Sequence, residues 1–187
     1  MTRTILKIGD PRLGRISQPV AAVTDEIKKL AADMLDTMYE SQGIGLAAIQ
    51  IGEEKRMFVV DIPECTQGAM TFINPVLVDH SAEKAPFEEG CLSIPGVRTR
   101  VVRSKKVTIR YTDLEGQSQE LKTEGLYAIC LQHEYDHLDG ILFVERAVED
   151  APRKRIQTIN DLLEEKNLPR FLDERAKPKK GKGGYRS

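Results

Sequence analysis

The sequence predicts an α+β fold, in which antiparallel strands pack around a central helix and further helices precede and follow them. Three observations favour this class. A helical pattern fills the stretch between Thr24 and Gly43, residues 57–123 hold short runs rich in β-branched residues, and helical patterns return after Gly125. Helices that stand before and after a block of strands, instead of alternating with them, are typical of α+β proteins.

Length and composition indicate one globular domain, residues 1–175, followed by a basic tail, residues 176–187. The chain has 187 residues, of which 40% are hydrophobic and 30% are charged, an ordinary balance for a soluble protein. The tail holds five cations, three glycines and no acid, which predicts disorder. The net charge of −1 gives no reason to expect binding to DNA or to a membrane.

Cysteine usage and the first residues bear on the compartment. Three cysteines, an odd number, argue against a disulfide framework. The N-terminal residues soon meet charge, glycine and Pro11, so a secretory signal is not expected. No apolar run approaches the roughly 20 residues that a membrane span needs. We therefore expect a cytoplasmic protein whose cysteines are ligands or core residues.

The first helix is predicted from its cap and its apolar stripe. Thr24 supplies the cap, and Asp25 and Glu26 suit the positive end of the helix dipole. Apolar residues then recur at helical spacing, and the run stops at Gly43. The stripe, which should face the core, consists of Ile27, Leu30, Ala31, Met34, Leu35 and Met38.

Strands are expected at residues 57–62, 71–78, 105–112 and 118–123, because these runs are β-rich and bounded by Pro, Gly and Asp. Asp113-Leu114-Glu115-Gly116 should form the hairpin turn between the last two. The short apolar run 141–144 is predicted to return as another strand.

Two helices are expected after the strands. One starts after Glu124-Gly125 and ends at Asp139-Gly140. Asp150 caps the other, residues 151–166, and Pro152 lies in its first turn, where the missing N–H costs nothing. Its apolar stripe consists of Ile156, Ile159, Leu162 and Leu163.

The second of these three helices carries the most informative motif, His133-Glu134-Tyr135-Asp136-His137, of the H-E-x-x-H type. Residues four apart share one helix face, with Cβ atoms about 5–6 Å apart. Two imidazoles can therefore hold one metal ion while Glu134 reaches a water molecule on it. The motif predicts a hydrolytic metal site.

Such a site needs a third protein ligand. The metzincin pattern fails because Phe143 stands where its third histidine belongs. A thermolysin-like carboxylate, Glu145 or Glu149, is an alternative. Cys130 lies about 7.5 Å along the helix axis from the expected ion, at 1.5 Å rise per residue, so it is interpreted as pocket wall or core.

The other two cysteines differ in context. Cys65 lies in Pro-Glu-Cys-Thr-Gln-Gly, which looks like a surface loop. Cys91 follows Glu89-Gly90 and precedes Leu-Ser-Ile-Pro. Its thiolate would complete a Cys-His-His set; alternatively, Cys91 is a small buried residue at a strand edge.

The segment Gly43-Ile44-Gly45-Leu46-Ala47-Ala48-Ile49-Gln50 is also unusual. Two glycines permit a path that leaves backbone N–H and C=O groups open to a peptide. A tight helix-to-strand crossing is the alternative. The segment lacks the Gly-Lys-Ser/Thr ending of a phosphate loop.

Together these segments resemble peptide deformylase. The family is marked by G-φ-G-φ-A-A-x-Q, E-G-C-φ-S and H-E-x-D-H, where φ is apolar. The three motifs occur here at residues 43–50, 89–93 and 133–137, in that order, and the likeness extends from about residue 5 to 175. It implies hydrolysis of the formyl group from N-formylmethionine at the start of new polypeptides, releasing formate.

The resemblance also implies roles for the site residues. Cys91, His133 and His137 would hold one divalent metal ion, with water in the open position. That water attacks the formyl carbon while Glu134 acts as general base and then acid. The Gln50 side chain and the Leu92 N–H would stabilise the oxyanion. The family favours iron(II), although zinc, nickel or cobalt suit the same ligands.

The methionine side chain needs an apolar pocket, and plain core packing is the alternative for the residues that suit one. Leu126, Ile129 and Cys130 share the helix face of His133. The backbones of Gly45 and Gly90 would pair with the peptide. The residues expected to bind substrate are Ile44, Gly45, Phe87, Gly90, Leu126, Ile129 and Cys130.

The helix at 151–166 resembles the C-terminal helix with which the bacterial form contacts the ribosome near the nascent-chain exit. Arg153, Lys154 and Arg155 suit an RNA surface, and an ordinary solvated face is the alternative. Two rival functions stay open on the motif alone. A zinc endopeptidase also uses H-E-x-x-H, and a binding module would close a structural metal site with a fourth ligand.

Overall fold

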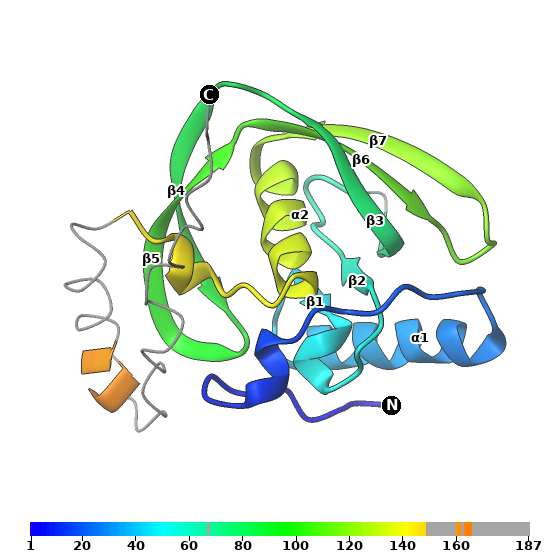
Figure 1. Ribbon diagram of the computed structural model, residues 1–187, viewed down its shortest axis with the longest axis horizontal. Coiled ribbons are helices and arrows are strands. Elements are labelled where there is room, and N and C mark those ends of the chain that lie inside the picture. Colours follow the sequence, from blue (N-terminus) through cyan, green and yellow to red (C-terminus); the bar gives the residue numbers. More distant parts are fainter. Residues whose placement is uncertain (67, 149–159, 162, 166–187) are drawn as a thin grey trace, which may run out of the picture.

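The computed structural model describes residues 1–66, 68–148, 160–161 and 163–165, and it has the predicted α+β architecture (Figure 1). The helices are α1 (Asp25–Glu40) and α2 (Gly125–Leu138), with short 3-10 helices η1 (Pro11–Gly14), η2 (Ala48–Ile51) and η3 (Phe143–Arg146). The strands are β1 (Gly45–Ala47), β2 (Met57–Val60), β3 (Met70–His80), β4 (Lys84–Cys91), β5 (Ile94–Ser104), β6 (Lys106–Thr112) and β7 (Ser118–Glu124).

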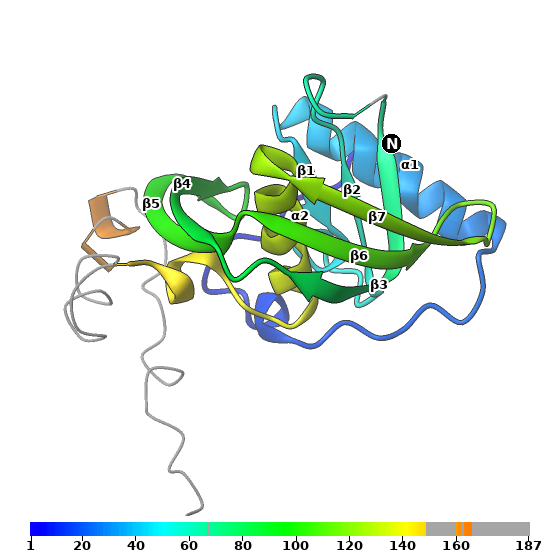
Figure 2. The same cartoon turned by 90° about the horizontal axis from the view of Figure 1, so that it is seen from above.

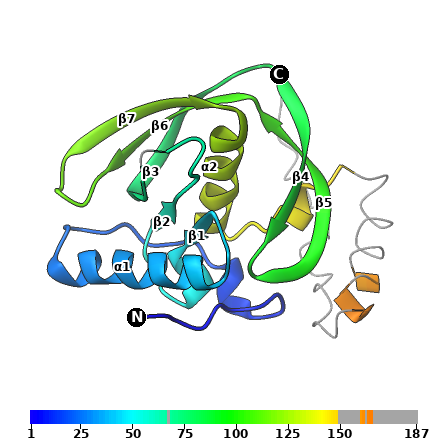
Figure 3. The same cartoon turned by 180° about the vertical axis from the view of Figure 1, so that it is seen from behind.

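The strands form two separate antiparallel sheets. One has five strands in the order β1-β2-β3-β6-β7, and the other is the β4–β5 hairpin. Helix α2 lies between the hairpin and the five-stranded sheet and contacts strands of both (Figure 2). Helix α1 packs against β1 and β2 and crosses the direction of α2 (Figure 3). Side chains of α2 can therefore contact residues of both sheets.

Helix α1 forms as its cap and stripe predict. The Thr24 hydroxyl accepts a hydrogen bond from the Ile27 N–H at 3.4 Å, and Asp25 and Glu26 occupy the first turn. The apolar stripe packs against β1 and β2, with Leu35 the one member that is only half-buried. Gln42, with φ of 56°, ends the helical path and turns the chain into β1.

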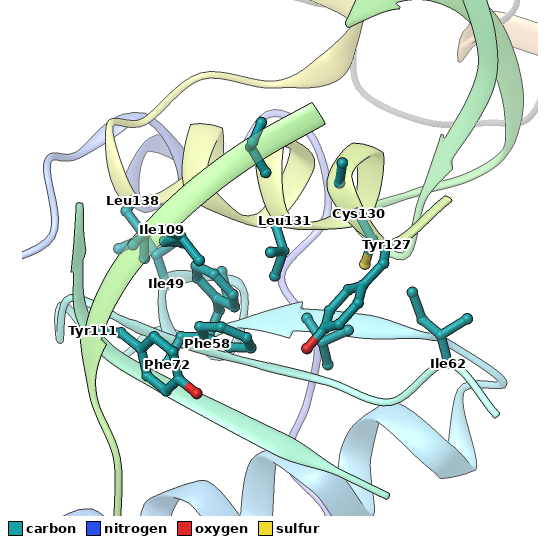
Figure 4. Packing of buried hydrophobic residues seen from close by; sticks show 14 residues of the cluster. Ile49, Phe58, Ile62, Phe72, Ile109, Tyr111, Tyr127, Cys130, Leu131 and Leu138 are labelled. Carbon is teal, nitrogen blue, oxygen red and sulfur yellow. The ribbon is translucent and has the colours of Figure 1, made fainter. Parts of the chain in front are cut away.

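The core between α2 and the sheet is built on aromatic rings. Phe58 stacks on Phe72 with ring centroids 4.8 Å apart, and Phe72 meets Tyr111 at 4.4 Å. Tyr127, Leu131 and Leu138 reach toward the sheet from α2 (Figure 4). Burying side chains of this size contributes about 1.5–3 kcal/mol each, so this contact fixes the position of α2.

The predicted strand boundaries shift modestly. The run expected to end at residue 62 ends at Val60, while β3 extends one residue earlier and two later than expected. The turn at 113–116 joins β6 to β7 as predicted, closed by the Gly116 N–H to Asp113 C=O bond at 3.1 Å.

Two features differ from the sequence prediction. The β4–β5 hairpin was not expected as strands, because residues 84–91 include Pro86 and Gly90 and show no apolar alternation. The strand predicted at 141–144 is wrong. Residues 143–146 form η3 instead, and the Leu142 N–H is bound by the Glu145 side chain at 2.9 Å. The apolar run is buried against the hairpin without a neighbouring strand to pair with.

Part of the third helix is described: residues 160–161 and 163–165 are helical, and Leu163 is buried with residues of the hairpin. Its predicted cap at Asp150, its basic residues 153–155 and the tail 176–187 lie outside the described residues. None of the helices in the described part is long and apolar enough to cross a membrane.

Gly140 should be the more sensitive of two turn glycines. Its φ is 69°, and an added Cβ would lie 2.5 Å from the Gly14 C=O oxygen, whereas Gly116 (φ 78°) has nothing within 4 Å of such a Cβ. We expect Gly116→Ala to cost about 1–2 kcal/mol, the usual penalty of a left-handed residue, and Gly140→Ala to cost clearly more. Urea denaturation of both variants measures this. Equal losses of unfolding free energy in the two variants would contradict the close approach of Gly140 to the Gly14 carbonyl.

Candidate metal centre

Three predicted ligands converge in the structure. One donor atom each from Cys91, His133 and His137 lies within 4.8 Å of the others, and the Cys91 Sγ is 3.3 Å from the His137 Nε2. Among the described residues this is the one such group of histidine, cysteine or acidic side chains. One thiolate with two imidazoles fits a zinc-like or iron-like divalent ion, and three protein ligands leave a position for water.

Local structure explains the convergence. His133 and His137 are one turn apart on α2, with ring centroids 5.0 Å apart. Cys91 ends β4, where the register with β5 shifts between Gly90 and Cys91. Such an irregularity re-aims the side chain that follows it. The hairpin thereby presents its sulfur to the histidine face of α2.

The ring of His133 is oriented by a hydrogen bond at its Nδ1. Its Nδ1 lies 2.8 Å from Glu89 Oε2, which leaves Nε2 for the ion. Arg103 binds Glu89 through two bonds of 2.7 and 2.9 Å and Asp136 through one of 2.5 Å, and all three side chains are buried. Burial raises the pKa of Glu89, but Arg103 and His133 outweigh it and bring that pKa to about 2. Glu89 is therefore a carboxylate that accepts from the imidazole.

His137 suits a ligand for a different reason. It is buried, and its Nδ1 has no hydrogen-bond partner among the described residues. Burial, with smaller contributions from His133 and Arg103, lowers the pKa of His137 well below its usual value. The ring is therefore neutral and offers a lone pair to a cation.

Glu134 lies beside the Cys-His-His cluster but is not part of it. It is 4% exposed, and its Oε2 has no hydrogen-bond partner in the described part of the chain. Burial raises the pKa of Glu134 to about 7. A Cβ added to Gly45 would lie 2.5 Å from Glu134 Oε1, so the carboxyl packs against bare backbone of β1. A buried carboxyl of raised pKa next to a metal centre suits proton transfer.

The two predicted oxyanion donors lie at the same site. Gln50 is fixed by its Oε1, which accepts from the Ala47 N–H at 2.8 Å. Its Nε2 donates to Ser93 Oγ at 3.1 Å and lies 3.4 Å from Cys91 Sγ. Leu92 follows Cys91 in the turn of the hairpin. The Gln50 amide and the Leu92 backbone thus approach the sulfur from two different elements.

The residues predicted to bind substrate line one cleft of about 850 Å³ next to this centre. Ile44, Phe87 and Leu126 are 41%, 37% and 37% exposed, an apolar surface open to a ligand. Cys130 is buried in the wall, and burial raises the pKa of its thiol well above the usual value, so it is no thiolate ligand. The cleft is lined by all seven predicted residues (Ile44, Gly45, Phe87, Gly90, Leu126, Ile129 and Cys130) and by Gln50, Cys91, Leu92, His133 and Glu134.

The other cysteine and carboxylate candidates differ in outcome. Glu145 binds the Leu142 N–H and is not in the metal cluster, and Glu149 lies outside the described residues. Cys65 is exposed, as its loop context predicts. Sequence reasoning missed the supporting role of Arg103. Its partners Glu89 and Asp136 stand inside two recognised motifs, but Arg103 itself carries no local signal.

Comparison with known proteins points in one direction. The sequence model described as polypeptide deformylase matches residues 2–153. A protein of Nitrosococcus oceani named peptide deformylase is 52% identical over 141 residues, covering 75% of this chain and 84% of that protein. One of Acinetobacter baumannii with the same name is 46% identical over 160 residues, covering 86% and 89%.

Solved structures agree. The chain superimposes with a TM-score of 0.81 and 36% identity on a peptide deformylase from Synechococcus elongatus in complex with actinonin, covering 89% of this chain and 87% of that one. A peptide deformylase from Legionella pneumophila gives a TM-score of 0.81 at 39% identity, covering 95% and 99%.

Glu89 should tune the affinity of this centre for a metal. Glu89→Gln removes the charge that orients His133, and losses of this kind typically weaken metal binding about 10–100-fold. Its neighbour Glu88 pairs with Arg98 at the surface, so Glu88→Gln is the matched control and should bind as the wild type does. Competition titration with a chelator measures both. Wild-type affinity in Glu89→Gln would contradict the role.

Proposed function

The chain belongs to the peptide deformylase family, and we propose that it removes the N-formyl group from the first methionine of new polypeptides with a metal ion held by Cys91, His133 and His137. The observation that carries this assignment of residues is the Cys-His-His cluster beside the buried carboxyl of Glu134, whose Oε2 has no hydrogen-bond partner among the described residues. The reaction cleaves the formyl amide with water and releases formate and a free amine.

Glu134 moves the protons. The metal, when bound, lowers the pKa of a water molecule toward neutrality. Glu134 would accept a proton from the water that attacks the formyl carbon and would later deliver it to the departing amine. The raised pKa of Glu134 suits both directions of transfer near neutral pH, because neither protonation state is then far out of reach.

Gln50 and Leu92 stabilise the charge that develops on the formyl oxygen. The Gln50 amide lies at the cluster and is fixed in advance, because its Oε1 accepts from the Ala47 N–H and its Nε2 donates to Ser93 Oγ. The Leu92 N–H supplies the second donor from the hairpin turn. Donors fixed in advance are worth most where water is excluded.

The cleft selects the first residue of the substrate. Ile44, Phe87 and Leu126 offer the apolar surface that a methionine side chain needs, with Ile129 and Cys130 deeper in the wall. The backbones of Gly45 and Gly90 pair with the peptide main chain in a strand-like manner. Hydrogen bonds to the peptide main chain do not distinguish side chains, so the enzyme should select only weakly among the residues that follow the methionine.

Iron(II) is our proposal for the metal in the cell, with zinc, nickel and cobalt as ions that the same ligands accept. We also propose that the chain works in the cytoplasm, where its substrates are made. A contact of the helix expected at 151–166 with the ribosome is a proposal from the family resemblance alone.

A zinc endopeptidase is the second candidate, and it rests on the H-E-x-x-H motif alone. It is not favoured, because relatives that are 52% and 46% identical are named peptide deformylase. The two activities differ in their products. An endopeptidase cuts an unformylated peptide internally, whereas a deformylase leaves the chain whole.

Formate release from formyl-Met-Ala-Ser tests the function directly. Protein purified without oxygen should release formate and leave Met-Ala-Ser intact. Glu134→Ala should retain its metal and lose activity, because it removes the proton acceptor and no ligand. Gln50→Ala should lower kcat about 10²–10³-fold at unchanged metal content, the usual cost of one oxyanion donor. Internal peptide cleavage, or loss of metal from Glu134→Ala, would refute the assignment.

Acetylated peptides should be poor substrates. Gly43 and Gly45 pack closely on Leu92 and Glu134: an added Cβ would meet them at 2.7 and 2.5 Å. The site should therefore admit the hydrogen of a formyl group but not the methyl of an acetyl group. Parallel assays of N-formyl-Met and N-acetyl-Met peptides check this. A comparable kcat/KM for the two peptides would show that the close packing at Gly43 and Gly45 does not exclude the acetyl methyl.

A further inference from the structure

The tip of the β4–β5 hairpin (residues 91–94) carries a metal ligand and an oxyanion donor on a sheet that is separate from the main one. The far end of the hairpin is joined to the main sheet by backbone bonds at Ser81 and Lys105. Near that same end, Arg103 binds Asp136 of α2. Among the backbone hydrogen bonds of the described residues, one joins the tip to another part of the chain: the Ile8 N–H donates to the Ser93 C=O at 2.9 Å.

That bond comes from the N-terminal segment (residues 5–8), which also reaches the other oxyanion donor. Two residues before Ile8, the Leu6 N–H donates to the Gln50 C=O at 2.7 Å. Ile5 is buried with α1 and β1, whereas Ile8 is buried with the hairpin. The segment thus spans the gap between the element that holds Gln50 and the tip that holds Leu92.

Lys7 completes this bridge. Its Nζ donates to the Leu92 C=O at 2.9 Å, and it lines the substrate cleft with Ile5. We propose that Lys7 is a positioning residue for deformylation, which ties the hairpin tip to the N-terminal segment and so sets the Leu92 N–H against the Gln50 amide. The inference rests on the proposed function, because it takes Leu92 and Gln50 as the oxyanion donors.

The expected effect is on turnover. Oxyanion donors act only if they already point to where the charge develops. A tip that is free to shift would bind the peptide in the ground state but meet the transition state with a misplaced N–H. The Cys91 side chain is held independently by its neighbours Gln50 and His137, so metal binding should survive the loss of Lys7.

The test compares three variants in the formate-release assay. Lys7→Met removes the donor and keeps the length of the side chain. Its kcat should fall about tenfold, less than the 10²–10³-fold cost of removing an oxyanion donor itself, with KM, metal content and melting temperature unchanged. Lys7→Arg should restore most of kcat, because a guanidinium also donates to a carbonyl. Lys28→Met, an exposed lysine of α1, is the matched control and should behave as the wild type.

The outcomes separate this inference from the proposed function. A wild-type protein that releases no formate refutes the function, whatever Lys7 does. An active wild type with unchanged kcat in Lys7→Met refutes the positioning role alone. A fall in kcat accompanied by metal loss, a lower melting temperature, a raised KM or no rescue by arginine also refutes it, since Lys7 would then support the fold or bind the peptide.

Discussion

The buried charge network around Arg103 is the interaction on which the metal centre depends. Arg103 on β5, Glu89 on β4 and Asp136 on α2 are each only 5% exposed, and Arg146 adds two bonds of 2.5 and 2.6 Å to Asp136. Removing one partner from such a buried set typically costs about 3–5 kcal/mol, because the other charges stay buried and unpaired. The network joins both strands of the hairpin to the helix, so it brings the sulfur of one within reach of the imidazoles of the other.

A polar joint suits this position better than an apolar one. The hairpin forms a sheet of its own, so strand register with the main sheet cannot fix where Cys91 lies. Apolar contacts tolerate sliding, whereas the Arg103–Asp136 and Glu89–His133 hydrogen bonds that join the hairpin to α2 are directional. The two parallel bonds from Arg103 to Glu89 hold both of these side chains in one orientation. Glu89 also accepts from His133, so the joint that docks the hairpin sets the orientation of a ligand ring as well. The same carboxylate of Glu89 therefore helps to place the hairpin on α2 and to orient the ring of His133.

The sequence predicted what is local and missed what is not. The Thr24 cap, the turn at 113–116 and the one-turn spacing of His133 and His137 are set by neighbours within a few residues, and each appears where expected. The hairpin strands 84–104 pair with each other and bury part of one face against residues distant in the chain, so no alternation marks them. The run 141–144 is apolar because it is buried there, not because it is a strand. Arg103 acts only through Glu89 and Asp136, which are distant from it in the sequence, so no residue spacing predicts its role.

The identity of Gly45 follows from the conflicting needs of Glu134. A general base gains its raised pKa from burial, yet it must face a cleft that water and peptide can enter. Gly45 lies in β1 and is not among the glycines with positive φ, so backbone conformation does not require glycine there. Space does, because Glu134 Oε1 occupies the place of a Cβ. Bare backbone covers one carboxyl oxygen, which a Cβ would displace, and the other oxygen has no hydrogen-bond partner among the described residues. The glycine loop therefore shapes the surroundings of Glu134, the proposed general base, and is not only a tight crossing from helix to strand.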